Sequence, residues 1–356
     1  MTNIDSAEEI KALDKSNLLG SILALPDQME DTWNKMVIND IPTECSLCKN
    51  VVVSGMGGSA LGGRIVDSLI TDRARTPIEV FTEFKLPNYV NKDTLVILSS
   101  YSGNTEETLS AGHEALNRGA TIFGIATGGK LKEFLEVNNL KNFIINPQFN
   151  PSNQPRMGLG YSIAAVLAIL ARCEFINLLD TEVKDAISVT RDFLNEFGVE
   201  NPTTENIAKS ISLKFKNKIP VLFASEHLLG IAHAFKNQLN ENSKAFSLLF
   251  DIPEANHHLM EGLRNPAEAK SFYHFLFLES ELYSKEVQKR YPITKEVVEK
   301  NEVSISSYNL RSKKKLNQIF EILALGSFVS FYLAMLYDLD PTPIPWVDYF
   351  KEKLAQ

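Results

Sequence analysis

Short apolar runs alternate with stretches of helical spacing along most of the 356-residue chain. Residues 4–37 come first and carry apolar side chains at loosely helical intervals, so we expect leading helices there. Strand-like runs follow at Val51–Val53, Ile78–Phe81, Thr94–Leu98, Ala120–Ala126 and Phe143–Ile145. Because strands that alternate with helices form parallel sheets covered on both faces, the pattern predicts an α/β unit.

The second half of the chain repeats this plan after an interruption at Pro147–Pro155. A long buried helix is expected over Tyr161–Cys173, and another over Ser312–Leu336 with Ser312 as its cap. New strands are predicted at Pro220–Ser225, Phe272–Leu278 and Val303–Tyr308, with an amphipathic helix over Leu228–Leu239. We therefore predict an α/β fold of two tandem units, with leading helices in residues 1–40, a first unit in 41–185 and a second in 186–356.

Length and charge narrow the class of protein. A chain of 356 residues is too long for one ordinary core and suits two domains. The formal net charge of −8 argues against a nucleic-acid partner, which usually requires a basic face. Met1–Lys15 lacks the apolar core of a signal peptide, and the apolar run Ile319–Leu336 contains Glu321, which favours a buried helix over a membrane span. We expect a cytoplasmic enzyme with no membrane partner.

Three cysteines occur, at positions 45, 48 and 173. Cys45 and Cys48 have the C-x-x-C spacing of redox motifs and zinc half-sites, but no second such pair completes a metal site. We interpret the cysteines as free cytosolic thiols. The six histidines form no compact ligand motif, so we expect no metal.

A glycine-rich turn, SGMGGSALGG at Ser54–Gly63, joins the first predicted strand to a helix. Glycines there let the backbone approach a ligand closely. Part of the turn also fits the dinucleotide fingerprint G-x-G-x-x-A, and Glu79 lies near the distance at which that fold holds the ribose. A ligand site and a purely structural turn both remain open at this point.

A second turn, SSYSGNTEET at Ser99–Thr108, places three hydroxyls at the start of a helix. Hydroxyl donors and the N–H groups of a helix start suit a phosphate monoester. Capping a helix needs only one such residue, whereas Ser100, Ser102 and Thr105 cluster here. Because a nicotinamide-binding fold gives no reason for this second turn, the pair of turns favours a phosphorylated small molecule.

A third region combines KNQLNENSK at Lys236–Lys244 with PEANHH at Pro253–His258. A carboxylate flanked by amides at a helix end can act as a general base, and a nearby histidine can move a proton on and off a ring oxygen. An exposed glutamate and a solvated histidine pair would give the same pattern. The residues permit an isomerase without selecting one.

Taken together, these motifs resemble those of the bifunctional phosphoglucose/phosphomannose isomerases, which have the sugar-isomerase (SIS) fold. The resemblance rests on GMGGSALGG, SYSGNTEETL, PRMGLGYS, KNQLNENSK, EANHH and DPTPIP, which follow one another in the family's order. It implies reversible conversion of glucose 6-phosphate and mannose 6-phosphate to fructose 6-phosphate, with no cofactor, by a homodimer with shared active sites. The sequence departs from the family at Gly62–Arg64, where GGR replaces GGD, and His258 beside His257 leaves the choice of histidine open.

The resemblance also implies a role for each matching residue. Glu241 would move the proton between C1 and C2, and Arg156 would stabilise the enediolate, because a developing oxyanion needs a cation. His257 of the neighbouring subunit would open the sugar ring, and Thr342 would leave room for the intermediate to rotate. The substrate-binding residues would be Gly58, Ser59, Ser100, Ser102, Thr105 and Lys244.

Two rival interpretations remain. A non-catalytic sugar-phosphate-binding regulator can share this fold, because fold does not settle function. Such a regulator would need neither Glu241 as a base nor His257 to open a ring. An NAD(P)-dependent dehydrogenase would rest on the glycine fingerprint alone and would leave the serine turn unexplained.

Overall fold

Two parallel sheets form the framework of the computed structural model, which describes residues 2–354. The first has five strands in the order β2-β1-β3-β4-β5, and the second has four in the order β7-β6-β8-β9. Counted from its own first strand, the second sheet repeats the order 2-1-3-4 of the first. The strands are β1 Asn50–Gly55, β2 Ile78–Phe81, β3 Thr94–Ser100, β4 Thr121–Ala126, β5 Lys141–Ile144, β6 Ile219–Ala224, β7 Leu248–Asp251, β8 Tyr273–Glu279 and β9 Ser304–Asn309. The predicted fold of two parallel α/β units is confirmed.

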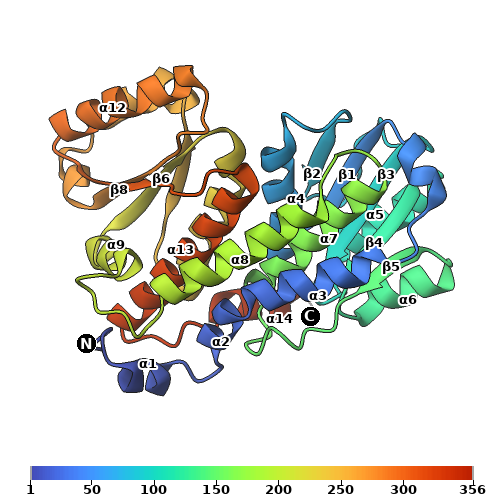
Figure 1. Ribbon diagram of the computed structural model, residues 1–356, viewed down its shortest axis with the longest axis horizontal. Coiled ribbons are helices and arrows are strands. Elements are labelled where there is room, and N and C mark those ends of the chain that lie inside the picture. Colours follow the sequence, from blue (N-terminus) through green and yellow to red (C-terminus); the bar gives the residue numbers. More distant parts are fainter. Residues whose placement is uncertain (1, 355–356) are drawn as a thin grey trace.

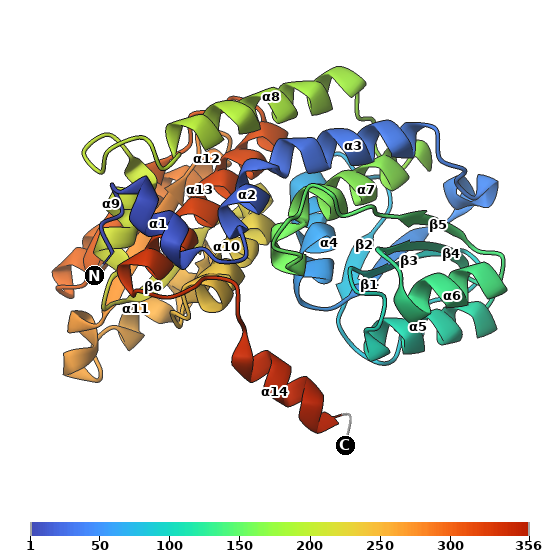
Figure 2. The same ribbon diagram turned by 90° about the horizontal axis from the view of Figure 1, so that it is seen from below.

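Helices cover both sheets and fill the space between them (Figure 1). Those of the first half are α1 Ala7–Leu13, α2 Leu18–Leu23, α3 Leu25–Val37, α4 Gly57–Ile70, α5 Glu106–Asn117, α6 Gly129–Val137 and α7 Leu159–Arg172. Those of the second half are α8 Asp180–Glu196, α9 Ile207–Phe215, α10 Leu229–Asn242, α11 Leu259–Gly262, α12 Lys285–Lys300, α13 Lys315–Leu336 and α14 Pro345–Leu354. Figure 2 shows that α14 projects from the body of the molecule.

Several elements differ from the sequence-based expectation. Strand β7 and helices α8, α9 and α12 lie in stretches where no element was expected. The proposed boundary between residues 185 and 186 falls inside α8, which packs against both α3 and α13. A division of the chain into units at that position stays a prediction.

Helix α13 begins after Lys314, and no side chain caps it, so the expected cap at Ser312 is wrong. The backbone N–H of Ser312 instead donates to Glu321, whose carboxylate also accepts from Tyr308 Oη and from the backbone N–H of Arg311. These donors account for a fully buried glutamate in an apolar helix. By length and composition α13 could cross a membrane, but its apolar window is entirely buried inside the protein.

Cys45 and Cys173 form a disulfide, so the expectation of free thiols is wrong for these two residues. The bond joins the turn before β1 to the end of α7, across 128 residues of sequence. Cys48, the other half of the C-x-x-C pair, is buried and free. Local spacing could not predict this bond, because only the tertiary fold brings Cys173 to Cys45.

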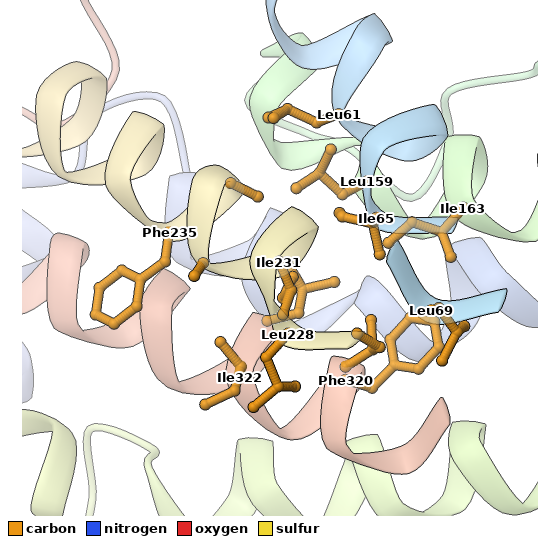
Figure 3. Packing of buried hydrophobic residues seen from close by; sticks show 14 of the residues in the cluster. Leu61, Ile65, Leu69, Leu159, Ile163, Leu228, Ile231, Phe235, Phe320 and Ile322 are labelled. Atoms are coloured by element: carbon orange, nitrogen blue, oxygen red, sulfur yellow. The ribbon is translucent and has the colours of Figure 1, made fainter. Parts of the chain in front are cut away.

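The two units share one apolar core. Figure 3 shows side chains of α4 and α7 from the first unit packed among side chains from the second. The first unit contributes Leu61, Ile65, Leu69, Leu159 and Ile163, and the second contributes Leu228, Ile231, Phe235, Phe320 and Ile322. Because neither unit buries these faces alone, the relative position of the two sheets is fixed by packing.

Gly230 marks the closest approach of the two units. A Cβ atom at this position would lie 2.2 Å from the backbone oxygen of Arg64 on α4. Ser68 reinforces the contact, since its Oγ accepts from the backbone N–H of Gly230 and lies 3.3 Å from the carbonyl oxygen of His227. Glycine at position 230 therefore sets the distance between α4 and α10.

Gly230→Ala is expected to destabilise the protein by about 1–3 kcal/mol, because an added methyl group must push two packed helices apart. Urea unfolding followed by circular dichroism measures the change. Gly262→Ala is the matched control, because a Cβ there meets no atom within 4 Å. Equal unfolding midpoints for Gly230→Ala and the wild type would contradict the close backbone contact.

Candidate active site

The serine turn lies between the end of β3 and the start of α5. Ser100 is buried, and its Oγ lies 2.8 Å from the Oγ1 of Thr105 and accepts from the backbone N–H of Gly103. Thr105 is the N-cap residue of α5, but its side chain makes no capping hydrogen bond. Ser102 is exposed in the same turn. The three expected hydroxyls therefore share one short turn at a helix N-terminus, where a phosphate is favoured.

The glycine turn packs directly against the serine turn. Ser59 Oγ accepts from the backbone N–H of Tyr101 at 2.8 Å, and Ser99 Oγ donates to the carbonyl of Ser59 at 2.9 Å. Gly58 touches the backbone of the next site segment, since a Cβ there would lie 2.9 Å from the backbone nitrogen of Arg156. A small pocket lined by Gly58, Ser59 and Tyr101 lies among these segments.

Arg156 is the centre of the second group of site residues. Its side chain is 1% exposed, and its guanidinium contacts protein acceptors from three segments of the chain. These are Gln154 Oε1 at 2.7 Å, Glu241 Oε2 at 3.5 Å, Asn242 Oδ1 at 2.6 Å and the carbonyl oxygens of Pro341 and Thr342 at 3.1 and 2.8 Å. Burial lowers the pKa of Arg156, and Glu241 opposes that effect. The guanidinium therefore serves both as a structural link and as a cation beside Glu241.

Glu241 lies near the C-terminus of α10, with its side chain 29% exposed. Removal from water raises the pKa of its carboxyl, while the cations Arg156, Lys351 and Lys244 act in the opposite direction. A partly desolvated carboxylate is a stronger base than a fully hydrated one. The geometry therefore suits the role of a general base.

Lys244 and Arg156 hold the segment that contains Thr342. Lys244 Nζ donates to the carbonyl oxygens of Asp340 and Pro341, and Arg156 donates to those of Pro341 and Thr342. Partial removal from water, together with Arg156, lowers the pKa of Lys244 to about 8. Thr342 is buried, and its Oγ1 has no hydrogen-bond partner among residues 2–354. Its hydroxyl is thus positioned beside Arg156 without an acceptor or donor of its own.

His257 is the one candidate catalytic residue that this chain does not bring to the cluster. It ends a short 3-10 helix, Glu254–His257, and its side chain is exposed. Neither the His257 nor the His258 side chain makes a hydrogen bond or ion pair within residues 2–354. The His258 ring does lie near that of Phe250, with a centroid separation of 6.5 Å.

Sequence reasoning missed the residues that orient Arg156. Gln154 and Asn242 bind its Nη1 and Nε, and Asn242 in turn donates to Ser330 of α13. The signal for Asn242 was present, since it is the amide directly after Glu241. Lys351 of α14 was also missed, although its charge influences Glu241.

The strand order of the first sheet differs from that of the classic dinucleotide-binding fold. The strand order β2-β1-β3-β4-β5 corresponds to 2-1-3-4-5, whereas the classic dinucleotide-binding order is 3-2-1-4-5-6. Glu79, the candidate ribose ligand, accepts from Tyr89 Oη at 2.6 Å. Within residues 2–354, no three His, Cys, Asp or Glu side chains lie close enough together to hold a metal ion.

Comparison with known proteins supports the same family. Residues 204–354 match the model of the bacterial phospho-glucose isomerase C-terminal SIS domain. A bifunctional phosphoglucose/phosphomannose isomerase from Caldicellulosiruptor bescii is 34% identical over 94% of this chain and 98% of its own length. One from Aquifex aeolicus is 30% identical over 92% of this chain and 97% of its own.

The fold is similar to that of a solved hypothetical protein from Thermus thermophilus, with a TM-score of 0.75 and 16% identity. That similarity covers 98% of this chain and 94% of the other, and at this identity it concerns the fold alone. The identity to full-length relatives, the two SIS-type sheets and the ordered motifs lead to one conclusion. This chain belongs to the bifunctional phosphoglucose/phosphomannose isomerase family.

Proposed function

We propose that this protein interconverts glucose 6-phosphate or mannose 6-phosphate with fructose 6-phosphate, with Glu241 as the base. The observation that carries the proposal is the pair formed by Glu241 and the buried Arg156, 3.5 Å apart. A proton α to a carbonyl is only weakly acidic, so its removal needs a positioned base and a cation for the oxygen that becomes negative. The names of the relatives from Caldicellulosiruptor bescii and Aquifex aeolicus give the substrates.

The phosphate would bind at the serine turn, through the hydroxyls of Ser100, Ser102 and Thr105 and the first N–H groups of α5. This places the sugar across Gly58 and Ser59, toward Arg156 and Glu241. Glu241 takes a proton from C2 or C1 and returns it to the other carbon, so no electron acceptor is needed. The Arg156 charge stabilises the enediolate between the two transfers.

Thr342 would contribute to the choice of C2 epimer. Its hydroxyl has no partner among residues 2–354, and two cationic side chains hold its segment in place. A small residue there leaves space for the enediolate to rotate about C2–C3, so that either face of C2 can be protonated. Lys244 is then a positioning residue for residues 340–342, in addition to its expected place near the substrate.

His257 would open the sugar ring in the site of a second subunit. Its exposed position and the absence of an in-chain hydrogen-bonding partner within residues 2–354 support action across an interface. A homodimer with two shared sites satisfies this requirement, because a two-fold axis places each His257 equivalently. A cytoplasmic location fits substrates that are charged metabolites.

The alternative of a non-catalytic regulator explains the serine turn but leaves the rest of the site without purpose. A protein that only binds a sugar phosphate has no need to desolvate a carboxylate beside a buried arginine, which costs free energy. The arrangement of Glu241 and Arg156 therefore favours catalysis.

Glu241→Gln is expected to lower kcat by about 10²–10⁴-fold or more, because the amide keeps the shape of the side chain but cannot take a proton. In deuterated water the wild type should exchange label into C2 of glucose 6-phosphate, and the variant should not. Substrate affinity should survive, since the serine turn holds the phosphate. Glu254→Gln, an exposed neighbour, serves as the control, and undiminished exchange in Glu241→Gln would move the base elsewhere.

Lys351→Met is expected to move the acid limb of kcat and kcat/KM to higher pH. Lys351 lowers the pKa of Glu241, so its removal raises that pKa and leaves less ionised base at a given acidic pH. Activity is lost as pH falls through the pKa of the base, and the loss should begin earlier in the variant. Lys353→Met on the same exposed helix is the matched control. An unmoved acid limb in Lys351→Met would show that another group controls it.

Mixing inactive Glu241→Gln and His257→Ala chains should restore activity if the sites are shared. In a mixed dimer one site contains both native residues and the other contains neither. Random reassociation of equal amounts should therefore recover about a quarter of wild-type activity in a two-fold dimer. His258→Ala in place of His257→Ala tests which histidine acts. Two inactive parents whose mixture stays inactive after subunit exchange would rule out shared sites.

A further inference from the structure

A cleft of about 630 Å³ lies at the other end of the contact between α4 and α10 from Glu241. Its walls come from the C-terminal half of α4, the start of α10, the 3-10 turn Glu226–Leu228 before it, Leu249 of β7 and Lys315 at the start of α13. Pockets of this size accommodate small metabolites. None of the residues assigned above to the isomerase site lines it.

One wall of the cleft carries basic groups that form no ion pair within residues 2–354. Arg64 and His233 line the cleft, and Lys236 follows His233 by one turn of α10. None of the three side chains makes a hydrogen bond or ion pair within residues 2–354. Burial, with Lys236 and Arg64, lowers the pKa of His233 to about 4, and burial with Arg64 lowers that of Lys236. Arg64 and Lys236 are therefore close enough to repel each other, and an anion would relieve that repulsion.

Most other charges in the cleft already have partners. Lys315 pairs with Asp72 at 2.7 Å, and Glu226 accepts from the backbone N–H of Ser284. Asp67 is the exception: its carboxylate accepts no hydrogen bond within residues 2–354, and burial raises its pKa, while the charge of Arg64 acts in the opposite direction. The cleft thus offers an unpaired basic group for an anion and an unpaired carboxyl for hydroxyl donors.

His227 also lines the cleft, and its ring carries a second hydrogen-bond acceptor. Gln318 Nε2 donates to the carbonyl of Ser312, so its Oε1 must accept from His227 Nε2, 2.7 Å away. The His227 Nδ1 is then an acceptor, and it is buried without a partner among residues 2–354.

Arg64 is the residue at which the sequence departs from the GGD motif of the family that it resembles. An aspartate there would make this wall acidic.

We propose that this cleft is a second binding site, for a small phosphorylated metabolite that bears hydroxyl groups. Its phosphate contacts Arg64, Lys236 and His233, and its hydroxyls donate to Asp67. The site is separate from the isomerase site, since His233 and Glu241 are about 12 Å apart along the axis of α10 at 1.5 Å per residue. A ligand there contacts α4 and α10, whose opposite ends carry Ser59 and Glu241.

Binding stoichiometry tests this proposal without relying on isomerase activity. Equilibrium dialysis of the wild type with radiolabelled inorganic phosphate should give two sites per chain. The Ser102→Ala/Thr105→Ala variant should keep only the cleft site, and Arg64→Gln/Lys236→Gln should keep only the serine-turn site. Cleft affinity should fall by about tenfold or more in the latter, as expected for loss of charged hydrogen-bond donors. Lys313→Gln/Lys314→Gln removes the same charge outside the cleft and should keep both sites.

The hydroxyl requirement is tested in the Ser102→Ala/Thr105→Ala background, where only the cleft should bind. Asp67→Asn should weaken binding of glycerol 3-phosphate but not of inorganic phosphate. Binding of only one phosphate per wild-type chain would overturn the proposal, and so would binding of two phosphates per chain of Arg64→Gln/Lys236→Gln. Equal effects of Asp67→Asn on both probes would overturn the assignment of Asp67. Circular dichroism of each variant checks that it is folded.

Discussion

The direct contact between α4 and α10 is the constraint on which the architecture of the site depends. Gly230 lies against the backbone of Arg64, so that no side chain separates the two helices there. The helices run in opposite directions through the shared core, because Gly58 at the start of α4 lies against Arg156, and Arg156 in turn binds Asn242 at the end of α10. Their separation therefore fixes how far the glycine and serine turns of one unit lie from the candidate base of the other.

Arg156 links the segments that carry the candidate catalytic residues. A fully buried guanidinium is costly unless its donors are satisfied, and here acceptors from its own segment and from two distant segments satisfy them. The same contacts bring Glu241 and Thr342 to one point and leave the Thr342 hydroxyl without a partner among residues 2–354. The cost of burying the charge is thus offset by hydrogen bonds that also orient the candidate catalytic residues.

The two ends of this helix pair differ in electrostatic character. At one end, Arg156 has Glu241 as its counter-ion within a network of hydrogen bonds. At the other, Arg64 and Lys236 form no ion pair among residues 2–354, although the chain as a whole carries a net charge of −8. Net charge therefore describes this molecule poorly, because the fold brings two cations without ion pairs close together.

By itself, the sequence determined the α/β class, the repeat of two parallel units and the glycine and serine turns of the candidate site. These follow from local patterns that act over a few residues, whereas the segments of Arg156 and Thr342 were expected only from the resemblance to the family. Only the tertiary structure decided that Cys45 pairs with Cys173, that α8 packs across the proposed boundary against α3 and α13, and that Asn242 orients Arg156. Each of these depends on segments far apart in the chain, whose meeting is set by the packing of the shared core and not by any local pattern.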